Sequence, residues 1–436
     1  MTQVADGDRR GQDVGWAEAL DRVRWLGPGL VMAATAIGAS HLVLAPTAGA
    51  SFGYALLWVV LLSHLFKYPA FEFGPRYAVA ADESLLDGYR DVPGPRGWAL
   101  WVFLAGTVVQ GVSVLAGVLG VASAVAAAAV PGLPLWAWSL LLGAACGMLL
   151  WSGGFGGLSG LSKWMLAILA AMTAVAFLAT PPPASAWARL VVPEVPGGAV
   201  LLLAALLGWM PTGIDVSVWH SLWALERRDE WRERAGGSER AASLRVGLTD
   251  MRIGYGLSFV LAVMTLTLGA EVLRPTGSVP EGADVALTLA RLYTDVLGEW
   301  MFPVFLVAAF FGMFSSAYGV LDGFPRAFEA TVRRLPLSAG ADREGSGPLY
   351  WGFLWGTLIL AVAETALLPD PVMLVTVAAV ASFLLAPVTF GLNYWCVTRL
   401  VDDRELRPGR LLRGWAVAGI FFMAAATGLY LWLHVL

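Results

Sequence analysis

Long apolar runs recur along almost the whole chain, and they constrain its fold more than any other feature of the sequence. A helix needs about 20 mostly apolar residues to cross the hydrocarbon core of a bilayer. About eleven such segments can be placed, at residues 26–48, 53–73, 97–129, 133–151, 161–180, 197–224, 247–270, 299–322, 349–368, 371–398 and 411–434. Only 14% of the residues are charged, against roughly a quarter in a soluble protein. The sequence therefore predicts an all-α integral membrane protein and excludes a soluble enzyme.

The positive charges predict the orientation of these helices. With the N-terminus inside, 25 of the 28 Lys and Arg residues fall on the inner side, and only Arg189, Arg274 and Arg291 lie outside. Inner loops of membrane proteins are enriched in Lys and Arg. We therefore expect a multi-pass protein of the cell membrane with a cytoplasmic N-terminus and an external C-terminus. The basic inner loop 226–246 is expected to contact anionic membrane lipid.

Two of the expected spans contain helix-breaking residues near their middles. Residues 36–42 in the first span read Ala-Ile-Gly-Ala-Ser-His-Leu, and residues 208–215 in the sixth read Gly-Trp-Met-Pro-Thr-Gly-Ile-Asp. Gly and Pro are common in ordinary membrane helices, but a broken helix at membrane depth must line a cavity or be buried in protein. The two breaks lie five spans apart, and a repeat unit with an odd number of helices reverses its direction in the membrane. This pattern predicts a transporter built from two inverted five-helix repeats, with its site at the breaks.

At these residues the sequence resembles the Nramp family of divalent-metal transporters. The similarity runs from Gly27-Pro28-Gly29 through residues 49–54 to residues 56–63, and it resumes at Met210-Pro211 and at Ser315-Ser316. The resemblance implies a LeuT-type fold of five plus five helices with broken helices 1 and 6. It also implies a secondary transporter that moves a small solute, by family a divalent metal ion, by alternating access, with no enzymatic activity and no cofactor.

The inverted five-helix repeat predicts how the chain is divided. Residues 1–25 form a cytoplasmic N-terminal segment, residues 26–180 the first repeat, residues 197–398 the second, inverted repeat, and residues 411–434 an additional eleventh helix. No Ser/His/Asp set or metal-protease pattern supports a membrane-embedded enzyme, and no attached domain supports a sensor. We expect neither nucleic acid nor an obligate protein partner.

Most of the metal ligands that the family uses are replaced in this chain. The family's first break reads Asp-Pro-Gly-Asn, whereas residues 38–41 here read Gly-Ala-Ser-His. The methionine of the sixth span is kept as Met210, but the histidine two residues later is Thr212. The glutamine of the tenth span falls at position 384 or 385, both leucine. The alternative is therefore a transporter of a small organic solute on the same scaffold, without metal transport.

The two breaks supply the expected substrate-binding residues, which are Gly38, Ser40, His41, Trp209, Met210, Thr212 and Asp215. Within this set, His41, Met210 and Asp215 would form a tentative site for Mn²⁺, Fe²⁺, Zn²⁺ or Cu. Each also has a structural alternative. His41 would bond to carbonyls freed by the break, Met210 would be a packing residue, and Asp215 would form a capping box with Thr212 at the start of the second half-helix.

Lys67 and Glu72 are charged residues inside the second span. Lys67 would either extend to the inner membrane boundary or supply a positive charge at the place where metal transporters accept a cation. The second interpretation favours a non-metal substrate. Glu72 stands four residues before Arg76, a spacing at which two side chains on one helix can pair.

Overall fold

The computed structural model describes residues 38–153, 155–234, 240–336 and 347–434, so the expected N-terminal segment 1–25 and the first part of the first span lie outside the described residues. No strand occurs in these ranges, which confirms the all-α prediction. The helical elements are η1 (Ser40–Leu44), α3 (Ala45–Phe52), α4 (Leu57–Ala81), α5 (Leu85–Arg90), α6 (Trp98–Ala129), α7 (Leu135–Ser152), α8 (Phe155–Ala179), η2 (Ala184–Leu190), α9 (Val200–Trp209), α10 (Val216–Glu226), α11 (Arg228–Arg234), α12 (Arg240–Leu268), η3 (Gly269–Leu273), η4 (Arg274–Thr276), α13 (Val285–Leu297), α14 (Met301–Arg334), α15 (Pro348–Leu367), α16 (Pro371–Arg399) and α17 (Arg410–His434).

Every expected span from the second to the eleventh coincides with helix. Among the described residues, 7 helices are long and apolar enough to cross a membrane: α6, α7, α12 with its continuation through η4, α14, α15, α16 and α17. The segment Trp164–Ala179 of α8 and the half-helix α9 are shorter apolar helices. The second span, α4, carries Lys67, Glu72 and Arg76 and is not in either group. The total of eleven spans stays a prediction.

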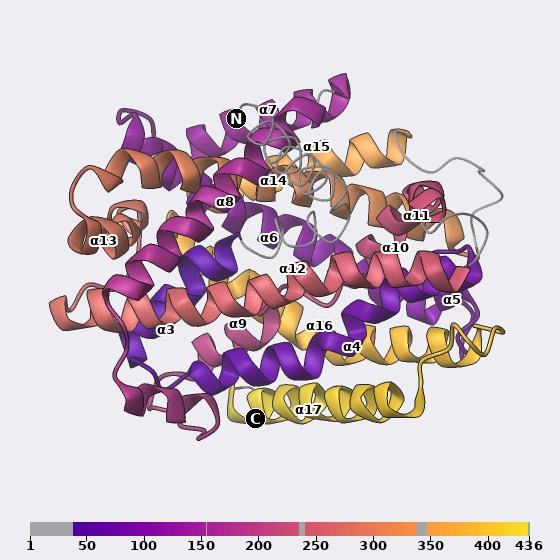
Figure 1. Ribbon diagram of the computed structural model, residues 1–436. Helices are drawn as coiled ribbons and strands as arrows, with labels where there is room; N and C mark the ends of the chain where they lie inside the picture. The colour runs from indigo at the N-terminus through magenta and orange to yellow at the C-terminus, as the bar shows by residue number, and fades with distance from the viewer. Residues whose placement is uncertain (1–37, 154, 235–239, 337–346, 435–436) are drawn as a thin grey trace, which may run out of the picture.

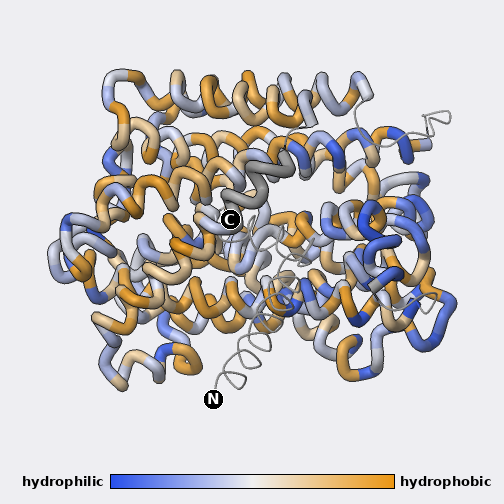
Figure 2. Tube along the Cα trace, turned by 45° about the horizontal axis from the view of Figure 1, so that its top comes forward, coloured by the Kyte–Doolittle hydropathy of each residue, from blue (hydrophilic) through white to orange (hydrophobic). Residues whose placement is uncertain are grey.

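Several long helices, among them α4, α12, α16 and α17, lie along a common axis, whereas α8 crosses them at an angle (Figure 1). Helices α5 and α11 lie at one end, and α13 lies at the opposite end. Figure 2 shows hydrophobic residues along the length of the helices and the largest group of hydrophilic segments at the α5 and α11 end. Helix α6 packs against α7, α14, α15 and α16, whereas α17 packs against α4, α9 and α16 along one side.

The sixth expected span is broken, as the sequence predicted. Helix α9 ends at Trp209 and α10 begins at Val216, and the segment between them contains a cis peptide bond between Met210 and Pro211. In the first expected span the described chain starts with a turn at Gly38, continues as the π-helix η1 and becomes α3. Because the preceding half of that span lies outside the described residues, the first break stays a prediction.

Glycines bring the helices around the break into direct backbone contact. A Cβ atom on Gly208 of α9 would lie 2.0 Å from the carbonyl oxygen of Ala379 in α16. A Cβ atom on Gly74 of α4 would lie 2.3 Å from the carbonyl oxygen of Ser217 in α10. Small residues allow such close approach of membrane helices. The break is therefore held between α4 and α16 with no side chain as a spacer at these two points.

Candidate functional site

A cavity with a volume of about 40 Å³ lies against the break, between α9, α10, η1, α6, α14 and α16. Its polar lining residues are Ser40, Thr212, Asp215, Ser316 and Ser382, and its aromatic lining residues are Trp209, Trp219 and Phe324. Four of the expected substrate-binding residues, Ser40, Trp209, Thr212 and Asp215, therefore meet in one cavity.

Asp215 is the carboxylate of the cavity lining. It stands directly before α10 and makes no capping hydrogen bond from its side chain. The first amides of α10 bond instead to the preceding turn, with Val216 N donating to Gly213 O at 3.2 Å and Ser217 N donating to Ile214 O at 3.0 Å. The expected capping box is therefore wrong, because α10 begins three residues later than that box requires. Asp215 is buried at 7% exposure beside the cavity, where its carboxylate can meet a cation.

Trp209 is fixed by a polar chain that reaches two other helices. Its Nε1 donates to the hydroxyl of Ser382 in α16 at 3.0 Å, and that hydroxyl donates to Oε1 of Gln110 in α6 at 2.5 Å. The sequence analysis missed Ser382, since it searched for a ligand of the tenth span at positions 384–385. Leu384 is 37% exposed, and Leu385 lies against α6. The available signal was that Ser382 is the polar residue nearest the middle of that span.

His41 and Met210 are not among the residues that line this cavity. The Nε2 atom of His41 lies 2.9 Å from the carbonyl oxygen and 2.9 Å from the hydroxyl of Ser258 in α12, and its Nδ1 lies 2.8 Å from the hydroxyl of Ser40. The ring lines a separate, smaller cavity beside α8 and α12. Met210 is buried at 0% exposure. Of the tentative metal ligands only Asp215 lines the cavity, and no group of three His, Cys, Asp or Glu within the described ranges could hold a metal ion.

A second buried histidine, which the sequence analysis did not single out, lies near His41. His64 of α4 donates from Nδ1 to the carbonyl oxygen of Val60 at 2.8 Å, and its Nε2 lies 3.4 Å from the hydroxyl of Ser258. Ser258 thus contacts both rings, and it links η1, α4 and α12 through polar groups. These two histidines hold helices together beside the site rather than facing its cavity.

Lys67 of α4 points into the break. Its side chain is 0% exposed, so the interpretation that it extends to the membrane boundary is wrong. The ammonium group donates three hydrogen bonds to backbone carbonyl oxygens, those of Leu207 at 3.0 Å, Gly208 at 2.8 Å and Thr212 at 2.7 Å. Ser63, one helical turn earlier, donates to the carbonyl oxygen of Met210 at 2.6 Å. One face of α4 thus pairs the backbone that the break exposes.

Glu72 belongs to a different cluster, on the part of α4 that leads away from the break. Its carboxylate is 2% exposed and accepts hydrogen bonds from Arg76 at 2.5 Å, Tyr68 at 2.6 Å and Arg252 of α12 at 3.3 Å. The expected pair of Glu72 and Arg76 is confirmed. Arg76 also donates to the carbonyl oxygen of Leu406, before α17. The cluster joins α4, α12 and the α17 approach, and it does not line the central cavity.

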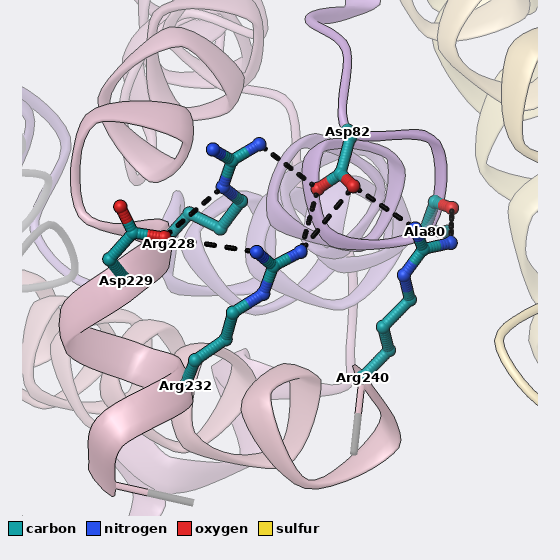
Figure 3. Close-up of polar contacts among 6 residues, drawn as sticks. All are labelled: Ala80, Asp82, Arg228, Asp229, Arg232 and Arg240. Carbon is teal, nitrogen blue, oxygen red and sulfur yellow. Dashed lines mark hydrogen bonds and ion pairs between the residues drawn. The ribbon is translucent and has the colours of Figure 1, made fainter. Parts of the chain in front are cut away.

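Three arginines surround Asp82, the C-cap residue directly after α4 (Figure 3). Arg228 lies 3.3 Å and Arg232 lies 3.2 Å from its carboxylate, and Arg240 lies 3.0 Å from it. Arg240 also donates to the carbonyl oxygen of Ala80 at 3.3 Å. This cluster holds α11 and the start of α12 against the end of α4. Asp229 of α11 also contacts Arg228 at 3.5 Å and Arg232 at 3.8 Å, so three arginines meet two carboxylates.

Comparison with known proteins places these features in context. The model of the family described as natural resistance-associated macrophage protein-like (Nramp) matches residues 29–433. An uncharacterised protein of Pasteurella multocida is 28% identical over 430 residues, which cover 93% of this chain and 91% of that protein. The divalent metal cation transporter MntH of Chromohalobacter salexigens is 28% identical over 308 residues, which cover 69% of this chain and 68% of that protein.

Solved structures show the same architecture. The manganese transporter of Eremococcus coleocola superposes with a TM-score of 0.69 at 14% identity, covering 92% of this chain and 85% of that one. Mhp1, a transporter of the nucleobase-cation-symport-1 family, superposes with a TM-score of 0.53 at 11% identity, covering 93% of this chain and 92% of that one. At such low identity the likeness concerns the fold, and it confirms the LeuT-type fold class expected from the sequence.

Proposed function

This chain belongs to the Nramp family, and from that premise we propose that it is a secondary transporter that moves a small solute, by family a divalent metal ion, by alternating access. The relatives named as divalent metal or manganese transporters support this proposal. The solute binds in the cavity beside the break of the sixth span, and the repeats 26–180 and 197–398 move relative to each other around it. Side chains of α4 and α16 contact the break, so it joins a helix of the first repeat to helices of the second.

Asp215 carries the proposal of a cationic substrate. Its buried carboxylate lies in the same cavity lining as the hydroxyls of Ser40 and Thr212. Carboxylate and other oxygen ligands suit hard or borderline divalent ions such as Mg²⁺ and Mn²⁺. We therefore place the metal at Asp215. The roles of Gly38, His41 and Met210 as further substrate or metal contacts remain proposals that substitution can test.

Uptake into proteoliposomes tests this function directly. Mn²⁺, Mg²⁺ and a panel of small organic solutes are offered to wild type and to the Asp215→Asn, His41→Ala and Met210→Ala variants. We expect Asp215→Asn to lower Mn²⁺ uptake at least about tenfold, since one charged ligand is worth more than about 1.4 kcal/mol. Glu364→Gln is the matched control, because that carboxylate of α15 does not line the cavity.

The outcomes separate the metal from its site. If no divalent ion moves or binds at millimolar concentration, the metal proposal fails. If Mn²⁺ uptake survives Asp215→Asn but is lost in His41→Ala or Met210→Ala, the transported ion is right and its placement at Asp215 is wrong. Equal losses in Asp215→Asn and Glu364→Gln would show that carboxylates matter only through overall charge or folding.

A small organic solute is the second candidate, and two observations favour it. Three aromatic side chains, Trp209, Trp219 and Phe324, line the cavity, and apolar walls with a few polar groups are typical of sites for organic ligands. In addition, the ammonium group of Lys67 already holds the carbonyl oxygens of the break. In the uptake experiment, this candidate predicts saturable entry of one organic solute with no divalent ion transported.

The orientation and the lipid contact remain proposals as well. We propose a cytoplasmic N-terminus and an external C-terminus, supported by the distribution of Lys and Arg and by the hydrophilic end of the bundle that contains α5 and α11. Arg228, Arg232 and Arg240 carry three positive charges, against the two carboxylates of Asp82 and Asp229 that they contact. Anionic lipid headgroups at the cytoplasmic surface would supply the missing negative charge.

A further inference from the structure

The C-terminal end of α9 exposes backbone groups that suit a cation. The last carbonyls of a helix have no partner within the helix, and this end of the helix dipole is negative. In α9 the chain then leaves helical geometry at Met210, so carbonyl oxygens of the break join those of the helix end. In transporters with discontinuous helices, such half-helix ends and unwound carbonyls coordinate free cations.

Here those oxygens have a resident partner. Leu207, Gly208 and Thr212 point their carbonyl oxygens at one nitrogen, the Nζ atom of Lys67, over distances of 2.7 to 3.0 Å. An ammonium group has three N–H donors and accepts nothing, so the three carbonyls use its full donor capacity. The stem of Lys67 is entirely buried, and it enters from α4, an element far from the break in sequence. The geometry is that of a coordinated monovalent cation attached to a side chain.

We propose that the carbonyl oxygens of Leu207, Gly208 and Thr212 form a cation site whose permanent occupant is the ammonium group of Lys67. The broken helix then needs no free cation at this point, and free ions are kept from these oxygens by the charge already there. A solute in the cavity meets Asp215 instead. This proposal goes beyond the transport function and does not depend on which solute is carried.

Chemical rescue of a Lys67→Ala variant tests the proposal. The substitution removes three carbons and the ammonium group, which together have the size of n-propylammonium. The full-length protein in detergent is heated with n-propylammonium, with Na⁺, K⁺ or Mn²⁺, or with n-propanol as the neutral analogue of equal length. We expect the variant to lose at least about 5 °C of Tm, because three buried carbonyls lose their donor. n-Propylammonium is expected to restore several degrees in a saturable manner, and n-propanol is expected to restore much less.

Ser63→Ala is the matched control, since it unpairs the carbonyl of Met210 on the same face of α4 but removes no charge. It is expected to lower Tm without any response to n-propylammonium. The proposal is overturned if n-propanol rescues Lys67→Ala as well as n-propylammonium does, if no cation raises its Tm, or if wild type or Ser63→Ala responds equally.

A second variant keeps the proposal testable if Lys67→Ala does not fold. Lys67→Gln retains N–H donors for the carbonyls but lacks the charge. If its Tm equals that of wild type, hydrogen bonding alone accounts for Lys67 and no cation site exists. A lowered Tm that rises with added K⁺ or alkylammonium supports the site. These measurements involve no transport, so a failure of the uptake experiment leaves them unaffected and the reverse also holds.

Discussion

Replacing Gly208 by alanine is expected to destabilise the protein, although alanine normally favours a helix. The new Cβ atom would lie 2.0 Å from the carbonyl oxygen of Ala379, while ordinary contacts begin at 3.4 Å, so α9 and α16 have to move apart. Overpacking of this kind costs about 1–3 kcal/mol, and the gain from replacing a helical glycine offsets about 0.5–1 kcal/mol. The net loss is on the order of 1–2 kcal/mol, which corresponds to a fall in Tm of a few degrees.

Thermal unfolding in detergent, followed by the loss of the monodisperse peak in size-exclusion chromatography, measures this change. Gly391→Ala in α16 is the control, because a Cβ atom there meets nothing within 4 Å. That variant is expected to unfold at or slightly above the wild-type temperature. Uptake by Gly208→Ala should also fall, since the displaced carbonyl of Gly208 is one of those held by Lys67. Equal unfolding temperatures for the two alanine variants would refute the close contact of α9 with α16.

Three further predictions concern other parts of the molecule. Arg76→Met is expected to cost about 1–3 kcal/mol, since the carboxylate of Glu72, 2% exposed, loses its closest partner but keeps Tyr68 and Arg252; an unchanged free energy of unfolding would contradict this. Trp209→Phe removes one hydrogen bond to α16 and should cost about 1 kcal/mol while changing solute affinity more than stability, which a binding titration of the transported solute measures. Burial raises the pKa of Asp87, but the hydrogen bond and the positive charge of Arg334 together lower the pKa by more than burial raises it. The pKa of Asp87 therefore lies below its ordinary value. Wild type is therefore expected to have a higher free energy of unfolding than Asp87→Asn above pH about 4, and this difference is expected to shrink as the pH falls. A difference that grows in acid would contradict the ion pair.

Local features of the sequence were sufficient for the helices and for the break of the sixth span. Apolar length is a property of a contiguous segment, and each of the second to eleventh expected spans coincides with helix, although α4 and α14 extend 8 and 12 residues beyond the expected ends. Pro211 stops α9 for a reason that lies in its own backbone, since it lacks the amide hydrogen that would continue the helix. The family resemblance depended on the same contiguous motifs, and the match over residues 29–433 confirmed it.

The expected capping box shows where local reasoning fails. The spacing of Thr212 and Asp215 fits the motif, but the pattern does not say at which residue α10 begins. Contacts of the break with α4 and α16 move that start to Val216 and turn the carboxylate of Asp215 to the cavity lining. The tenth span shows the same kind of error. The site residue was expected at position 384 or 385, whereas Ser382 is the residue that contacts Trp209.

By itself, the sequence determined that this chain is a helical membrane protein, where one helix breaks and to which family the chain belongs, whereas its count of eleven spans stays a prediction. Only the tertiary structure decided which polar groups meet at the break. Lys67 lies 140 residues from Leu207 and 145 residues from Thr212 along the chain, so no local pattern could reveal that they are partners. The physical reason is that a helix end buried in a membrane protein has to find donors, and which donor reaches it depends on how distant helices pack.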